Sequence, residues 1–118
     1  NINSAGVNTS IGAKILYGNG SSAVSVSSGG LPAGFTVPNS YTSNTFSNNS
    51  VTIPNYTSAS FKSISTNSVQ ENNANSCFAA IFAGLWSNTS AITSVSFGVG
   101  AGTFAEFSSI SLYGIKYD

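Results

Sequence analysis

Turn-forming residues interrupt this 118-residue chain at short intervals, as in Gly-Asn-Gly at 18–20, Pro54-Asn55, and Glu-Asn-Asn-Ala-Asn at 71–75. Between these signals lie runs rich in Val, Ile, Thr, Phe and Tyr, which suit the pleated backbone of a strand. Good helix formers are scarce, since Gln occurs once and Met and Arg are absent. The sequence therefore predicts an all-β fold with antiparallel strands.

Seven segments are expected to be extended, and the last of them provides one or two strands. They are residues 11–17, 23–26, 46–53, 61–69, 77–86, 91–97 and 104–117. This number of short strands is typical of an antiparallel β-sandwich, and we expect a jelly-roll-like arrangement. No repeat of fixed period and no linker divides the chain, so residues 1–118 are expected to form one β-sandwich domain.

Residues 77–86, with the sequence CFAAIFAGLW, are apolar throughout. Periodicity alone leaves both a buried helix and a buried strand open for such a run. The length of ten residues, the internal Gly84 and the β-rich surroundings favour a strand. We expect this strand to lie at the centre of a sheet and to be buried on both faces.

Few side chains in this chain carry a formal charge. They are Lys14, Lys62, Lys116, Glu71, Glu106 and Asp118, and there is no histidine. These residues make up 5% of the chain, whereas soluble domains usually contain about a quarter of Asp, Glu, Lys and Arg. Most enzymes need a group that titrates near neutral pH or a metal held by His, Cys and carboxylates. We therefore expect a protein that is not an enzyme and binds no metal or cofactor.

Two alternatives to this expectation depend on the glutamates. Glu71 and Glu106 formally allow a two-carboxylate glycosidase, although two isolated glutamates on a surface are the simpler interpretation. Calcium held by carbonyl oxygens, Asn side chains and one Glu stays open, but no motif supports it.

The charge balance also bears on binding partners. The formal net charge is zero, so the chain has no electrostatic feature suited to nucleic acid or to an anionic membrane. No stretch of about 20 apolar residues and no signal-peptide pattern occurs, so we expect no membrane insertion. Near-zero net charge also offers little repulsion between copies, which permits self-association.

Two short features suggest chemistry that the rest of the chain does not support. Cys77 has no histidine to act as its base, and its neighbours Phe78, Ala79 and Ile81 indicate a small core residue. The sequence GVGAG at 98–102 lacks the Lys-[Ser/Thr] and the glycine spacing of phosphate-binding loops, so we expect a turn there.

Three aromatic residues, Tyr41, Tyr56 and Trp86, lie at or beside turns rich in Asn, Ser and Thr. A planar ring next to amide and hydroxyl groups can hold a sugar by stacking and hydrogen bonding, which makes these residues candidate glycan contacts. The alternative is that the rings hold loops against the core while their polar ends stay in water.

Several segments resemble a family of bacteriophage virion proteins found in phages of aquatic bacteria. They are residues 16–22 (LYGNGSS), 53–58 (IPNYTS), 71–74 (ENNA), 83–94 (AGLWSNTSAITS) and 111–115 (SLYGI). The match extends over most of the chain. Segment 83–94 is the most specific of the set, whereas 111–115 alone would be weak.

The resemblance implies a structural or fibre-like protein with a β-sandwich fold and no catalytic residues. Members carry a further β-rich stretch upstream of the segment that corresponds to residues 1–3, so one or two N-terminal strands are expected to lie outside this sequence. We expect a component of the virion surface, in capsid decoration or in a head or tail fibre. It would form a homotrimer and bind other virion proteins. The alternative is a carbohydrate-binding module that recognises a host-surface glycan.

Overall fold

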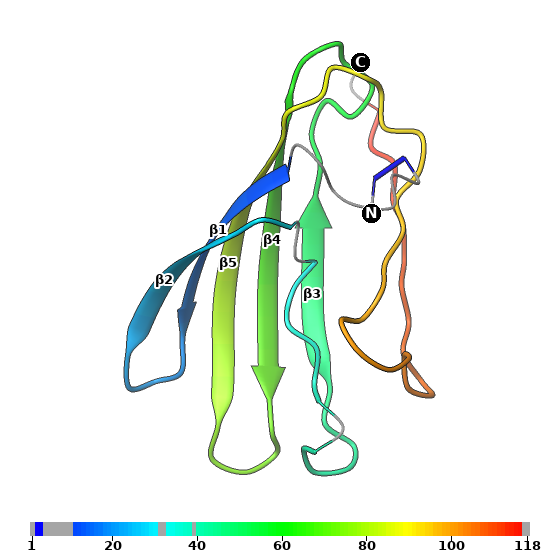
Figure 1. Ribbon diagram of the computed structural model, residues 1–118. Helices are drawn as coiled ribbons and strands as arrows, with labels where there is room; N and C mark the ends of the chain where they lie inside the picture. Colours follow the sequence, from blue (N-terminus) through cyan, green and yellow to red (C-terminus); the bar gives the residue numbers. More distant parts are fainter. Residues whose placement is uncertain (1, 4–10, 31–32, 39, 117–118) are drawn as a thin grey trace.

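The computed structural model describes residues 2–3, 11–30, 33–38 and 40–116. Its strands are β1 (Ile11–Gly18), β2 (Ala23–Ser28), β3 (Ser47–Thr52), β4 (Lys62–Glu71) and β5 (Cys77–Trp86). They form one antiparallel sheet in the order β2-β1-β5-β4-β3 (Figure 1). The described residues contain no helix, so the prediction of an all-β fold is confirmed.

Asparagine side chains build the two tight connections between neighbouring strands. After β1, the Asn19 side chain accepts hydrogen bonds from the amides of Ser21 and Ser22, and Gly20 adopts a positive φ of 87°. After β4, the Asn72 side chain accepts bonds from the amides of Ala74 and Ser76. A side chain that replaces a backbone partner in this way favours a turn over a continuing strand. These turns are therefore encoded locally, where the sequence predicts them.

β5 is the central strand, because it pairs with β1 on one side and with β4 on the other. This confirms the strand interpretation of residues 77–86 over the helix. The prediction that both faces are buried is wrong, since side chains alternate between buried Phe82 and exposed Ile81 along the strand. Such alternation means that only one face of the sheet is covered by the described residues.

Two groups of side chains cover this inner face. At one end the core cluster contains Ile2, Ile11, Ile64, Trp86 and Ile92. At the other end Phe35 packs edge-on against Phe82, with ring centroids 5.3 Å apart, and against Tyr17 at 5.8 Å. Phe35 belongs to the irregular segment 33–38, and Ile92 follows β5 in another irregular segment. Among the described residues, the inner face is therefore covered by irregular segments rather than by a second sheet.

Residues 91–97 and 104–116 do not form the strands expected of them. In the described structure Val95 makes one isolated bridge with Ile2, and none of the residues 104–116 is part of a strand. Their sequences suit an extended backbone, but a strand also needs a neighbour to accept and donate its hydrogen bonds. Residue 117, the end of the predicted segment, lies outside the described residues.

Cys77 is exposed, which corrects the prediction of a core residue. It occupies the first position of β5 on the uncovered face, opposite Glu71 of β4. The apolar neighbours that suggested burial alternate between the two faces, and only one of those faces is covered.

The described residues form one open sheet of five strands, so a sandwich or jelly roll remains a prediction. The radius of gyration is 15.2 Å, whereas a compact domain of this length has about 13.5 Å. The larger value agrees with a sheet that has a layer on one side only.

Candidate functional site

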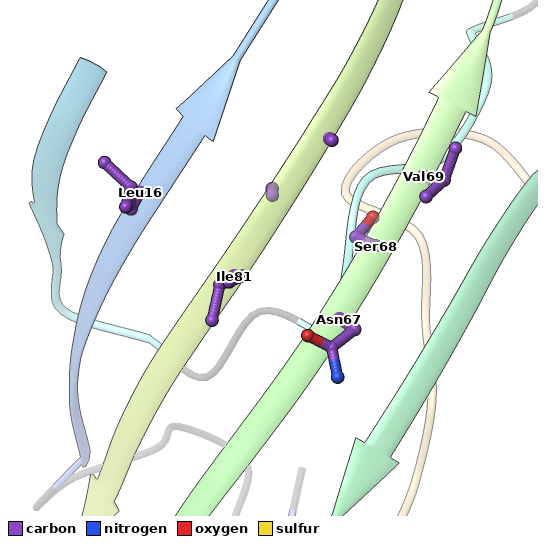
Figure 2. A pocket seen from close by; sticks show the side chains of 7 residues that line it. Leu16, Asn67, Ser68, Val69 and Ile81 are labelled. Carbon is purple, nitrogen blue, oxygen red and sulfur yellow. The ribbon is translucent and has the colours of Figure 1, made fainter. Parts of the chain in front are cut away.

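The uncovered side of the sheet, called here the outer face, presents alternate residues of the strands to solvent. Its central residues are Gly12, Lys14, Leu16, Ser63, Ser65, Asn67, Val69, Ala79, Ile81, Ala83 and Leu85, all of them exposed. The strand register places Leu16, Ile81 and Asn67 side by side across β1, β5 and β4, and Figure 2 shows these side chains on neighbouring strands. Small and apolar residues thus dominate the centre of this face.

Two shallow hollows lie on the outer face, one of about 290 Å³ beside Leu16, Val69 and Ile81, and one of about 340 Å³ beside Gly12 and Leu85. Hollows of this kind do not enclose a ligand, because small-molecule sites bury most of the ligand surface. A sheet face with shallow hollows is instead suited to the side chains of another sheet, since two packed sheets lie about 10 Å apart.

The outer face carries very little charge. Lys14 donates a hydrogen bond from Nζ to Ser27 Oγ at 2.5 Å, which turns its ammonium toward the β2 edge. Glu71 lies at the far end of β4, where its carboxylate accepts a hydrogen bond from the Asn73 amide. Lys14 is thus the one charged side chain among the central residues of this face, so burial of the centre would cover few charges, and uncompensated charge is the main cost of burying polar surfaces.

A second exposed apolar surface is the C-terminal arm, defined as residues 104–116. Its large exposed side chains are Phe104, Phe107, Ile110, Leu112, Tyr113 and Ile115. Leu112 is 86% exposed, Tyr113 83% and Ile115 90%. Single exposed apolar residues are common, but a run of them on extended backbone marks an interaction site.

The structure does not bring the candidate glycan contacts together. Tyr41 precedes β3 and is half-buried, whereas Tyr56 follows β3 at the opposite end of that strand and is 47% exposed. Trp86 is 6% exposed and belongs to the core cluster, so its ring offers no free face for a sugar. Among these three residues, Tyr56 presents the most ring surface to solvent.

Lys62 is a buried charge that sequence reasoning missed. It is 1% exposed, and its Nζ donates to the carbonyl oxygens of Ser58 at 2.7 Å, Ser90 at 2.5 Å and Asn88 at 3.4 Å. The same nitrogen lies 5.2 Å from the centre of the Trp86 ring. The sequence signal that could have indicated its burial is the spacing in β4: Lys62 lies two residues before the inward-facing Ile64, so both side chains point to the same face. These contacts satisfy the ammonium and tie two loops to the sheet, which indicates a structural role.

No group of three or more His, Cys, Asp and Glu side chains gathers within the part of the chain that the structure describes. Among the same residues, no helix has the length and apolar character needed to cross a membrane.

Comparisons of the chain with protein-family models, with curated proteins and with solved structures find no match. The resemblance to phage virion proteins therefore depends on the sequence segments alone. The surfaces described above are the remaining basis for a functional argument.

Proposed function

We propose that this chain is a non-enzymatic structural component of a virion surface, in capsid decoration or in a head or tail fibre. It works by packing against copies of itself and against other virion proteins outside the cell. The observation that carries the proposal is the sparsely charged, partly apolar outer face, which is regular and left uncovered by the described residues. The phage-like sequence segments supply the virion setting.

The size of the outer face is adequate for such packing. Strands β1, β4 and β5 have eight to ten residues, and at about 4.8 Å between strands their face covers on the order of 500 Å². Two such faces in contact bury about 1,000 Å², which is the lower limit of specific protein interfaces. Sheets packed in this way complete a β-sandwich between two chains, with each copy providing one layer. We propose a homotrimer as the assembled state, which needs a further contact besides this face, because face-to-face packing joins two copies only.

Two measurements test the proposal. Sedimentation of the purified chain over a range of concentrations should show a defined oligomer, and antibody labelling should locate the chain on the surface of intact phage particles. A chain that stays monomeric at every concentration and is absent from particles would overturn it.

A carbohydrate-binding module is the second candidate function, and Tyr56 is the observation that favours it. Tyr56 is 47% exposed in a turn beside Asn55 and Thr57. On a glycan array, Tyr56→Ala should remove binding while Tyr56→Phe, which keeps the ring, retains most of it. Binding that both variants leave unchanged would exclude Tyr56 as a contact.

A further inference from the structure

Residues 109–115 of the C-terminal arm, with the sequence SISLYGI, have the properties of a strand without a sheet. Within the described part of the chain they form no backbone hydrogen bond, and their apolar side chains are among the most exposed in the molecule. An extended backbone in this state needs donors, acceptors and apolar contacts from elsewhere.

The turn before this segment is strained. Phe107 has a φ of 68°, a left-handed conformation that bulky side chains rarely adopt, and the Ser108 amide donates to the Ala105 carbonyl at 3.2 Å. Backbone strain of this kind persists only where the surrounding structure imposes it, and it is found preferentially at functional sites.

The free edge of β2 is a suitable acceptor. Among the described residues, β2 pairs with β1 on one side only, so the backbone groups along its other side are available to a further strand. Soluble proteins usually protect such edges with charges or proline, and the β2 sequence AVSVSS contains neither. Val26 is 41% exposed on this edge, which leaves apolar surface beside the free backbone.

The side-chain patterns of the two segments match. Along β2, Val24 and Val26 point to the inner face, as the paired Tyr17 and Ile15 do, and Ser25 points to the outer face. A strand with Ser-Ile-Ser-Leu at 109–112 laid beside β2 places its apolar residues next to the two valines, and its central serine next to Ser25. Apolar pairs and serine pairs on neighbouring strands stabilise a sheet. The alternation of apolar and serine residues therefore sets the register of the added segment against β2. The other free edge, β3, has the sequence SNNSVT and offers one apolar residue.

A chain does not reach its own β2 edge with this segment. Figure 1 shows the arm, coloured orange to red, beyond β3, on the opposite side of the sheet from β2. We infer that residues 109–115 of one copy add as an extra strand to the β2 edge of a second copy. This inference rests on the self-association in the proposed function and identifies surfaces by which it occurs.

The lengths of the two segments support a second copy as the occupant. β2 has six residues and segment 109–115 has seven, so main-chain pairing can extend along the whole edge. Because side chains alternate along a strand, Ile110 and Leu112 lie beside the two valines, whereas Tyr113 and Ile115 point to the outer face. Backbone pairing therefore supplies most of the affinity, as it does for other added strands. The main-chain hydrogen bonds need no charged partner, which agrees with the few charges of this chain.

Cysteine cross-linking between two differently tagged, co-expressed full-length chains tests the inference. Both chains carry Cys77→Ser. One also carries Ser25→Cys on β2, and the other carries Ser111→Cys in the arm. Since each chain then has a single cysteine, a disulfide between the two tags can form only between copies. After oxidation, we expect most oligomers to contain a disulfide-linked pair of chains that carries both tags.

The matched control moves the acceptor cysteine to Ser50→Cys, on the other free edge, β3, where the side chain also points to the outer face. We expect at most a tenth of the cross-linking seen with Ser25→Cys. If the chain is an oligomer on particles and cross-links equally well at both edges, or not at all at Ser25→Cys, the addition of the arm to β2 is overturned and the proposed function stands. A chain that is monomeric and absent from particles would overturn both the strand addition and the proposed function.

A charge variant gives an independent measurement on the intact chain. Leu112→Asp changes a side chain that the isolated fold leaves exposed, so the circular dichroism spectrum should not change. It should weaken association roughly tenfold or more, because the carboxylate would be buried beside the valines of β2. Thr103→Asp, at an exposed position outside the strands, should leave association within about twofold. Equal effects of the two variants would contradict burial of Leu112 in the assembly.

Discussion

At the scale of single residues, Lys62 illustrates how a charged side chain stabilises this core. Its ammonium is held by loop carbonyls and by the Trp86 ring rather than by a carboxylate. Removal of the ammonium leaves carbonyl oxygens without their donor, and each such loss is costly when the group is buried. The residue therefore has more influence on stability than its place on a polar strand suggests.

We expect Lys62→Met to lower the free energy of unfolding by about 2–4 kcal/mol, measured by denaturant titration. Lys14→Met is the matched control, because Lys14 is exposed and makes one side-chain hydrogen bond, to Ser27. The control should change stability by about 0.5 kcal/mol or less. Equal losses of unfolding free energy in the two variants would show that the buried contacts of Lys62 do not stabilise the fold.

Gly34 is a position where only glycine fits. Its φ is 122°, and a Cβ there would clash with the Asn49 side chain. Asn49 has little freedom to move, because its Oδ1 accepts from Ser68 Oγ at 2.6 Å and its Nδ2 donates to the Phe35 carbonyl at 3.1 Å. These bonds hold the loop that brings Phe35 to the inner face.

Gly34→Ala should therefore lower the melting temperature and cost about 1–3 kcal/mol of unfolding free energy. Gly29→Ala provides the comparison, since nothing lies within 4 Å of its added Cβ. Calorimetry of the two variants measures the difference. A Gly34→Ala protein as stable as the Gly29→Ala protein would mean that the loop adopts another conformation.

At the scale of elements, the side chains of β5 point alternately to the two faces of the sheet. Phe82 is 1% exposed on the inner face and packs against Phe35, whereas its neighbour Ile81 is exposed on the outer face. Because side chains alternate in a strand, adjacent positions of similar apolar character have very different surroundings. Stability should follow this alternation in the dilute, unassembled chain.

We expect Phe82→Ala to cost about 3–5 kcal/mol of unfolding free energy, and Ile81→Ala about 1 kcal/mol or less. Unfolding at low protein concentration measures the fold by itself. At high concentration, Ile81→Ala should also weaken assembly if the outer face packs against another copy. A loss for Ile81→Ala as large as for Phe82→Ala at low concentration would indicate that another part of the same chain covers the outer face.

At the scale of the whole molecule, the formal net charge is zero and the charged residues are few. Assembly through sparsely charged faces and backbone pairing depends little on screening, because salt acts mainly on exposed charges. Oligomer dissociation, followed by sedimentation, should therefore change by no more than about threefold between low and molar salt. A steep dependence on salt would show that the few charged groups control assembly.

The strand-forming parts of β1, β4 and β5 could be predicted from sequence because the signals are local. Turn residues such as Asn19 and Asn72 provide their own hydrogen bonds, and the runs between them suit an extended backbone. The absence of histidine and the scarcity of charge are likewise properties of composition, and they argue against catalysis without reference to tertiary contacts. Of the candidate glycan contacts, however, the buried position of Trp86 depends on contacts with distant residues, which local patterns do not report.

By itself, the sequence determined the fold class, the position of each hairpin turn and the central strand, since backbone preferences act between near neighbours. Only the tertiary structure decided which face of the sheet is covered, that Lys62 is buried and Cys77 exposed, and that residues 109–115 have no partner among the described residues. Burial depends on segments far apart in the chain, such as Ile2 and Ile92 over Trp86, that meet only when the sheet has formed. Strand pairing likewise requires a second backbone, and for the C-terminal arm we infer that another copy supplies it.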